Sequence, residues 1–533
     1  MPLTTDAEIR NLLTAARKAA RTTALDIPFR KMGSGLHRDD AGKRGVAAAV
    51  VTALLLAACT VGPNYKRPAD ATPPMFKEAT GWVTAVPGDA LDKGPWWTLF
   101  GDPVLDDLCA RIEISNQNVA TAAAAYDQAR ALVGEARAGY FPTVDITPGV
   151  TRSGGGGSSG TTITGTGSTG AGGTTGTTTI GSSGSGTRYR ITAGASWEPD
   201  LWGRVRRTVE QARGTAAASA ADLAAARLSA QTMLATDYLQ LRALDAEIDL
   251  VAATATSFDR ALKITTNRYN AGVSAKIDLL QAQTQVASTR GDLAELVRQR
   301  GVLEHAVAVL TGAAPVAFAI AHAPWHPVVP AVPLDLPSTL LERRPDIAAA
   351  ERRVAAANAG IGVQVAAFYP NLTLTGSAGQ SATSIGSLFS GSAFLWSLGA
   401  SLAQSVFNGG LTSARVAAAR AAWEQSVATY RQTVLAALQD TEDQLIGSRQ
   451  LAETFTLRQA ASAAADQTEK LVLNQYLAGQ VAFTDVVTVQ ATALTARRTL
   501  VTATVNRQAT AVGLIRSLGG SWATTYRTPV PAA

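Results

Sequence analysis

Two tracts of this chain run for almost 70 residues without a proline, and each ends in Ala-Gly. They occupy residues 203–272 and 411–479. At 1.5 Å per residue, a helix of about 68 residues spans roughly 100 Å, whereas globular helices usually have 8–20 residues. Frequent alanines permit close packing of such helices, as in coiled-coil-like assemblies. The chain is therefore predicted to be mainly α-helical, with a glycine ending each long helix.

The sequence around each Ala-Gly pair is written twice. NRYNAGVSAKID (267–278) and NQYLAGQVAFTD (474–485) share six residues at an offset of 207. Further proline-free segments, roughly 275–311 and 482–518, follow the two phrases and predict return helices. The two phrases are thus predicted to form the tips of two helical hairpins.

A second repeated element precedes each long tract. GYFPTVDITPGV (139–150) matches AFYPNLTLTGSA (367–378), and in the first copy Val144, Ile146, Pro148 and Val150 alternate with polar residues. Alternation continues at 189–197 and 394–402, with apolar and small polar residues in turn. Period-2 alternation predicts β-strands with one apolar face. We expect four strands, two in each copy of an internal two-fold repeat.

The loop between the first two strands, 153–186, is almost entirely Gly, Ser and Thr. Such a segment has no apolar surface to bury and is expected to be a solvated loop. The offset between the copies is 228 at the prolines of the strand motif but 207 at the tips. The excess length of this loop explains the difference.

Four short strands cannot close a sheet on themselves. Transmembrane barrels need at least eight strands, because open sheet edges do not occur in lipid. If these strands span a membrane, several chains must contribute to one barrel, and three chains would supply twelve strands.

The N-terminus has the pattern of a lipoprotein signal. Lys43 and Arg44 precede a short apolar run, 46–58, that ends at Cys59 within Leu-Ala-Ala-Cys. The run is too short for a comfortable membrane-spanning helix, and its end resembles the bacterial lipobox, in which the cysteine is acylated. Thr60 is not the aspartate of inner-membrane retention, which favours the outer membrane. Residues 1–31 are not needed for this signal, so Met32 is a second candidate start.

Charge and metal-ligating residues exclude several classes of function. The net charge is +6, but residues 1–58 hold nine Lys/Arg and five Asp/Glu, which leaves +2 for the remainder. A nucleic-acid partner is therefore not expected. Two cysteines cannot form a disulfide framework, and His322 and His326 lie in a proline-containing stretch that favours a loop over a metal site.

No catalytic motif was found. The sequence has no phosphate-binding loop, no convincing triad and no metal-ligand spacing, and NAGIGV (358–363) follows an Ala-rich helix instead of a strand. The chain is not expected to be an enzyme or to need a cofactor. A lipid-anchored coiled-coil spacer would account for the long helices but not for two matched strand hairpins.

Several motifs, in this order, resemble the TolC-type outer-membrane efflux family, in the lipoprotein branch serving resistance-nodulation-division (RND) pumps. They are VGPNYKRP (61–68), WWTLFGDPVLDDL (96–108), WEPDLWGRVRR (197–207), LLERRPDIAAAERRVAAANAGIGVQVAAFYP (340–370), FNGG (407–410) and the two glycine tips. Each is modest alone, but the ordered set is specific and covers roughly 60–520.

This resemblance implies a homotrimer with a 12-stranded transmembrane β-barrel on a long periplasmic α-helical barrel. The tips would meet a periplasmic adaptor (membrane fusion) protein, and an inner-membrane RND pump would complete the tripartite efflux system. The chain would be a passive exit duct in the outer membrane, anchored by lipid and extending into the periplasm. The alternative is the outlet of a type I protein-secretion system.

Three tip residues are implied to form the periplasmic gate. By resemblance, Asp485 belongs to a ring of acids at the constriction, and Asp278 bonds the tyrosine that matches Tyr476. Spacing alone favours solvated surface acids near helix N-termini, where the helix dipole stabilises negative charge, and the resemblance shifts the balance to a gate. Val481 and Thr488 depart from the family pattern, in which some members carry a gate arginine and a second acid.

Other candidate residues also have two interpretations. Ala271, Gly272, Ala478 and Gly479 would form the adaptor-contact tips, or would only cap helices. Three aromatic residues would form a lipid-facing girdle, or would pack between the barrel and the helices: Trp197, Phe394 and Trp396. Cys109, in an amphipathic segment before the first strand, is expected to be a small buried hydrophobe.

The expected organisation follows these boundaries. Residues 1–58 form an N-terminal extension and signal peptide, and 59–103 a lipid-anchored segment. The first efflux repeat covers 104–312, a linker covers 313–337, and the second repeat covers 338–520 before a tail at 521–533.

Overall fold

A computed structural model describes residues 60–68, 75–78, 95–153, 186–331 and 343–520, all within the unit Cys59–Ala533. The predicted signal peptide, the lipidation residue Cys59 and the tail 521–533 lie outside the described residues. So do nearly all of the Gly/Ser-rich loop, the end of the linker 313–337 and parts of the segment 59–103.

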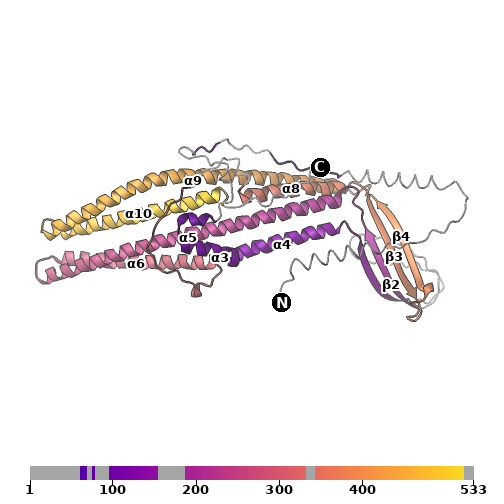
Figure 1. The fold of residues 1–533 in the computed structure, drawn as a ribbon, viewed down its shortest axis with the longest axis horizontal. Coiled ribbons are helices and arrows are strands. Elements are labelled where there is room, and N and C mark those ends of the chain that lie inside the picture. Colours follow the sequence, from indigo (N-terminus) through magenta and orange to yellow (C-terminus); the bar gives the residue numbers. More distant parts are fainter. Residues whose placement is uncertain (1–59, 69–74, 79–94, 154–185, 332–342, 521–533) are drawn as a thin grey trace, which may run out of the picture. The chain divides into compact units, whose positions relative to one another are not determined.

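The long helices have the predicted lengths (Figure 1). Helix α5 (Arg204–Asn270) has 67 residues and is followed by α6 (Lys276–Leu310) with 35 residues. Helices α9 (Leu411–Leu477) and α10 (Phe483–Ser517) repeat these two lengths. Each long helix starts after a left-handed glycine and continues until the next one because no proline interrupts the backbone hydrogen bonds. The prediction of two matched helical hairpins is confirmed.

Shorter helices precede the strands in both copies. Helix α3 (Pro103–Ser115) is capped by the Asp102 carboxylate, which accepts hydrogen bonds from the first backbone N–H groups. Helices α4 (Gln117–Ala138) and α8 (Pro345–Ala366) have 22 residues each. Helix α4 packs along α5, and α8 packs along both α5 and α9. Three 3-10 turns complete the described elements: η2 (Trp96–Phe100), η3 (Pro315–Ala317) and η4 (Gly391–Ala393).

Four antiparallel strands form one sheet in the order β1-β2-β3-β4. Their bounds are β1 (Thr143–Ser153), β2 (Gly186–Trp197), β3 (Asn371–Ala382) and β4 (Phe394–Ala403). The β1–β2 connection has 32 residues and the β3–β4 connection has 11, a difference of 21. This difference equals the change in repeat offset, 228 against 207, and confirms where the extra length lies.

The main core lies midway along α5, away from the sheet. Leu234, Tyr238 and Leu241 from α5 meet Leu105 and Ile112 from α3, and all are almost fully buried. Nearer the sheet, small residues bring backbones together: a Cβ at Gly214 would lie 3.0 Å from the Cβ of Ala356 in α8. Among the described residues, no helix combines the length and apolarity needed to cross a membrane.

Candidate functional site

The turn between α5 and α6, here called the first tip (271–275), is a glycine-terminated helix cap. Gly272 has φ +74°. Its N–H donates to the Tyr269 carbonyl at 2.9 Å, and the Val273 N–H donates to the Arg268 carbonyl at 2.8 Å. This pair of hydrogen bonds is the Schellman arrangement, which uses carbonyls that the helix end leaves unpaired.

The second tip (478–482), between α9 and α10, repeats the same geometry. Gly479 has φ +76°, and its N–H donates to the Tyr476 carbonyl at 3.0 Å. The Gln480 N–H reaches the Gln475 carbonyl at 2.9 Å. A Cβ at either glycine would meet no atom within 4 Å, so glycine is required there by backbone conformation and not by space. Ala271 and Ala478, which precede the glycines, are exposed.

The two carboxylates predicted to form the gate, Asp278 and Asp485, each accept a hydrogen bond from a residue of the neighbouring tip. Asp278 accepts a hydrogen bond from the Ser274 hydroxyl at 2.8 Å. Asp485 accepts from the Ala482 N–H at 3.1 Å and so caps the start of α10. Asp485 is exposed and Asp278 is half-buried. Within one chain, Asp278 therefore has a different partner from the tyrosine that the family resemblance implies.

Tyr476 instead joins the two hairpins through an arginine. The Arg268 guanidinium in α5 donates to the Tyr476 hydroxyl at 3.1 Å and also lies 5.5 Å from the ring centroid. The same ring lies 5.7 Å from that of Phe483, which is buried at the start of α10. Sequence reasoning did not identify Arg268, although the repeat marks it: the corresponding residue in the second copy is Gln475.

The sheet has one apolar face and one polar face. The register aligns Val144 and Ile146 of β1 with alanines of β2, and Leu374 with Ala400 across β3 and β4. All the predicted apolar positions therefore fall on one face, and many are exposed, including Ile146 at 72% and Leu398 at 80%. The opposite face carries mainly Thr, Ser and Gly, with Thr supplied by the first three strands. This arrangement suits a sheet with lipid on one side and water on the other.

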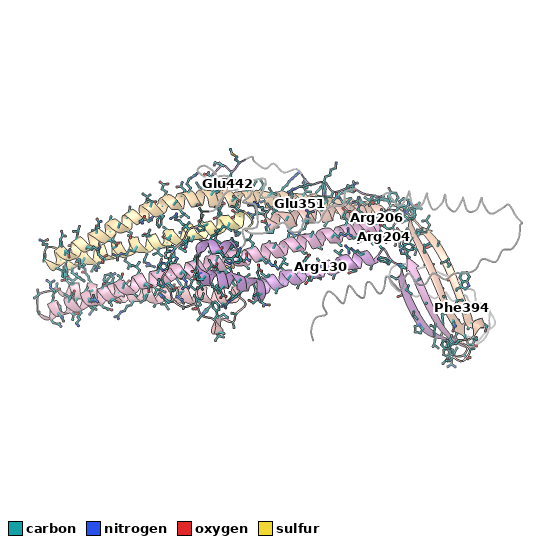
Figure 2. The ribbon with its side chains drawn as sticks, in the orientation of Figure 1. Arg130, Arg204, Arg206, Glu351, Phe394 and Glu442 are labelled. Carbon is teal, nitrogen blue, oxygen red and sulfur yellow. The ribbon has the colours of Figure 1, made fainter. Side chains whose placement is uncertain are left out.

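The three predicted girdle residues lie at opposite ends of the apolar face. Trp197 ends β2 beside the helices, and its indole N–H donates to the Tyr140 carbonyl at 3.0 Å. Phe394 and Trp396 begin β4 and are 53% and 72% exposed. Figure 2 shows Phe394 at the end of the sheet that is remote from the helices. The sequence analysis missed Phe407, which is 90% exposed just beyond β4.

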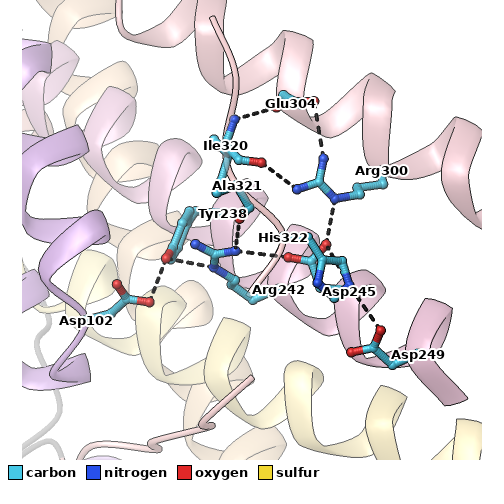
Figure 3. Close-up of polar contacts among 10 residues, drawn as sticks. All are labelled: Asp102, Tyr238, Arg242, Asp245, Asp249, Arg300, Glu304, Ile320, Ala321 and His322. Carbon is cyan, nitrogen blue, oxygen red and sulfur yellow. Dashed lines mark hydrogen bonds and ion pairs between the residues drawn. The ribbon is translucent and has the colours of Figure 1, made fainter. Parts of the chain in front are cut away.

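A buried ionic network, shown in Figure 3, fixes the middle of the first copy. The fully buried Asp245 carboxylate accepts from Arg242 at 3.0 Å and from Arg300 of α6 at 2.6 Å. Arg242 also donates to the Tyr238 hydroxyl at 2.9 Å, and this hydroxyl donates to Asp102 at 2.6 Å. Burial, together with the bond to Asp102, raises the pKa of Tyr238 well above its usual range. The phenol thus stays neutral and links α3 to the network.

The same arginines hold the segment that follows α6. Arg242 donates to the carbonyl of Ala321 at 2.8 Å, and Arg300 donates to that of Ile320 at 2.7 Å. The next residue, His322, lies 3.2 Å from the Asp249 carboxylate. The described residues contain no group of three or more His, Cys, Asp or Glu side chains that could hold a metal ion.

Cys109 is fully buried in the core, as predicted. Burial raises the pKa of its thiol, with a smaller contribution from the Asp106 carboxylate. A buried, protonated thiol has little reactivity.

A second buried arginine holds the segment that follows Cys59. Arg207, 3% exposed, donates to the Val61 and Gly62 carbonyls at 3.2 and 3.3 Å and to the Asn64 side chain at 2.9 Å. Asn358 of α8 donates to the Pro63 carbonyl at 2.9 Å. The VGPN motif is thereby held between α5 and α8, close to the sheet. Arg207 ends the WEPDLWGRVRR motif, but the sequence did not indicate these contacts, because residues 61–64 lie more than 140 positions away.

Comparison with known proteins agrees with this architecture. The chain is 30% identical over 473 residues to the pyoverdine export outer membrane protein OpmQ of Pseudomonas aeruginosa, covering 88% of this chain and 95% of OpmQ. It is 27% identical over 476 residues to the cation efflux system protein CusC of Escherichia coli, covering 88% and 97%.

Solved structures show the same fold. The outer-membrane channel OprN has a TM-score of 0.75 at 28% identity and covers 87% of this chain and 99% of its own. The open-state MtrE outer membrane channel of Neisseria gonorrhoeae also has a TM-score of 0.75, at 25% identity, with coverages of 87% and 98%. The sequence matches the outer membrane efflux protein family over residues 108–313 and 336–520. The chain therefore belongs to the outer membrane efflux protein family.

Proposed function

We propose that three copies of this outer-membrane efflux channel close into one duct, with strand β1 of each copy pairing with β4 of the next. The observation that carries this proposal is the sheet: its apolar face is exposed, and β1 and β4 are free at its two edges. Free edges are not stable in lipid, and three sheets of four strands would give a closed barrel of twelve. The end of the sheet remote from the helices would then face the cell exterior.

A barrel of this kind also gives the aromatic residues a role. Trp197 at one end and Phe394 with Trp396 at the other would lie at the two membrane interfaces. The stretch from Phe394 to Leu402 has nine residues, which is the length of a tilted transmembrane strand. Acylation of Cys59 would add a lipid anchor on the periplasmic side, where Arg207 holds the segment that follows it.

The helices would then form a periplasmic tunnel that narrows at the two tips. Asp278, Tyr476 and Asp485 are the proposed gate residues. Because Asp485 is exposed at the start of α10, three copies converging on an axis would repel one another and attract cations. The duct would be passive and would catalyse no reaction.

Asp485→Ala tests this gate in planar bilayers. The variant channel should conduct more in the resting state and lose cation preference, because the ring of acids is gone. Asp443→Ala, an exposed acid midway along α9, is the matched control and should leave both properties unchanged. Unchanged conductance and selectivity in the Asp485 variant would remove this residue from the gate.

The exposed tips are the proposed contact with a periplasmic adaptor that links the duct to an inner-membrane RND pump. Ala271, Gly272, Ala478 and Gly479 present small, backbone-rich turns that a helical hairpin could approach closely. A photo-crosslinker at Gln480 should capture the adaptor, whereas one at Val150 on the apolar face of the sheet should not. Failure at several tip positions would mean that the glycines only end helices.

The cargo does not follow from the family. The similar proteins include one named for pyoverdine export and one named for cation efflux, so channels of this fold carry unlike substances. An adaptor and an inner-membrane pump encoded beside this chain would support drug, metal or small-molecule efflux. A neighbouring peptide exporter would instead support type I protein secretion.

A further inference from the structure

Charged residues are scarce in the sheet and unevenly placed. Residues 143–197 and 371–403 contain just four: Asp145, Arg152, Arg188 and Arg190. Asp145 lies near the helical end of β1, where it pairs with Gly194. The three arginines lie at the opposite end of the β1–β2 pair. All the charge in the outer half of the sheet is therefore positive.

The register separates the three arginines between the two faces. Arg188 and Arg190 pair with Thr151 and Gly149, on the polar face, and both are exposed. Arg152 pairs with Thr187 and lies on the apolar face with Val150. Only Arg188 and Arg190 would therefore line the lumen of the proposed duct.

No acid in this part of the chain neutralises these two arginines. Asp145 is the sole acid in the strands, and it lies four positions from Gly149, the partner of Arg190. That separation is about 14 Å along the strand, longer than the Debye length of about 8 Å at physiological salt. The segment 154–185 and all of 371–403 contain no Asp, Glu, Lys or Arg. The neighbouring β3, and β4 of an adjoining copy, add no acid.

We propose that Arg188 and Arg190 form a cationic ring in the outward mouth of the duct that binds small anions bearing carboxylate or phosphate groups. This inference rests on the proposed trimer, in which two arginines per chain give six around one lumen. Guanidinium groups bind both anion types through paired N–H donors. A ring of like charge inside a low-dielectric wall focuses the field and selects the opposite ion.

The ring makes the two ends of the duct opposite in sign. Asp485 at the periplasmic tips attracts cations, whereas the outward mouth attracts anions and repels cations. An anionic cargo would be drawn toward the exit once it has passed the tips. The arrangement also predicts that polyvalent anions in the external medium block the mouth from that side.

The experiment compares the unmodified channel, Arg188→Ser/Arg190→Ser and the control Arg152→Ser in planar bilayers of neutral phospholipid. Citrate is added to one side at a time, and the reversal potential is measured in a KCl gradient. In the unmodified channel, citrate should reduce the current from the sheet side only. The double variant should lose this block and shift its reversal potential toward that of potassium. Arg152→Ser, on the other face, should retain both properties.

Two results would contradict the proposed cationic ring. In the first, citrate reduces the current equally from both sides. In the second, the double variant keeps both the citrate block and the ion selectivity of the unmodified channel. If Arg152→Ser alone abolished the block, or the block appeared only with added lipopolysaccharide, the arginines would bind lipid phosphates and not luminal anions. If the channel carries no current, citrate binding is measured by calorimetric titration of the purified protein. Binding is expected for the unmodified channel and for Arg152→Ser, but not for the double variant. A protein that is not a trimer contradicts the proposed function instead.

Discussion

The two copies of the repeat have the same helix lengths, but different kinds of side chain lie at the middle of their long helices, α5 and α9. At the middle of α5, Tyr238 and Asp245 belong to the buried ionic network. At the corresponding positions of α9, 207 residues on, the chain has Leu445 and Ala452. Leu445 is fully buried in the apolar core. At these two positions the first copy thus makes directional charged bonds to α3 and to the segment after α6, whereas the second copy packs apolar side chains. Charged bonds of α9 lie a few residues earlier, from Asp440 to Arg344 and Arg516.

The two copies are therefore alike in helix length and tip geometry and differ at the middle of their long helices. Helix length and tip geometry are the same in both copies, as expected if both tips reach the proposed constriction. The midpoints differ in their polar partners, because side chains of the first copy bond Asp102 before α3 and the carbonyls of residues 320 and 321. We expect substitutions to separate the copies most strongly at the midpoint and least at the tips.

The largest expected effect comes from Asp245→Asn. The variant leaves Arg242 and the largely buried Arg300 without their shared carboxylate, which should cost about 3–5 kcal/mol of unfolding free energy. Chemical denaturation of the detergent-solubilised protein, followed by circular dichroism, measures this loss. Asp249→Asn, at an acid that is 61% exposed, should change the unfolding free energy by no more than about 0.5 kcal/mol. Equal effects of the two variants would mean that the network is not stabilising.

Tyr238→Phe should have a smaller effect in the same assay. It removes a hydroxyl that accepts from Arg242 and donates to Asp102, so the expected loss is about 1–3 kcal/mol. Tyr269→Phe, on the exposed surface of the same helix, should be neutral. A neutral Tyr238→Phe would show that α3 is held by apolar packing alone, as expected for the Leu445 region of the second copy.

Gly272→Ala and Gly479→Ala should have nearly equal effects. Both glycines have φ near +75° and open space at the Cβ position. The cost therefore comes only from the left-handed backbone, about 1–2 kcal/mol at each site. Hydrogen exchange at the tip amides is the appropriate measurement. A clear difference between the two sites would show that one tip is held by contacts that the other lacks.

Arg268→Gln should have the smallest effect on stability. It gives the first copy the residue of the second and removes an exposed cation–π contact worth about 0.5–1 kcal/mol. Because Arg268 joins the two hairpins through Tyr476, the variant should nevertheless open more often in bilayer recordings. Arg290→Gln loses only the ion pair with Asp259 within the first hairpin, so this variant should not open more often. If both variants open alike, the link does not restrain the tips.

Much of the fold could be predicted from local sequence. The absence of proline predicts the length of each long helix, and the glycine in the Ala-Gly pair predicts where that helix ends. The period-2 alternation assigns Ile146 and Leu398 to the same face of the sheet. These signals are local because they depend on backbone geometry and on neighbouring side chains. Partners distant in the chain could not be predicted. Helical spacing accounts for the pairs Arg207–Glu210 and Arg242–Asp245, but no local pattern identifies the bonds of Arg207 to residues 61–64 or of Asp245 to Arg300. The expected bond from Asp278 to Tyr476 came from resemblance alone.

Three chains are proposed to share one lumen, with β1 of each pairing to β4 of the next. Three-dimensional electron microscopy of the purified, lipid-reconstituted protein can show this arrangement. We expect a three-fold particle in which the sheets form a closed barrel across the bilayer and the helical tips converge on the axis. Single chains without a common lumen, or sheets that remain open at β1 and β4, would contradict it.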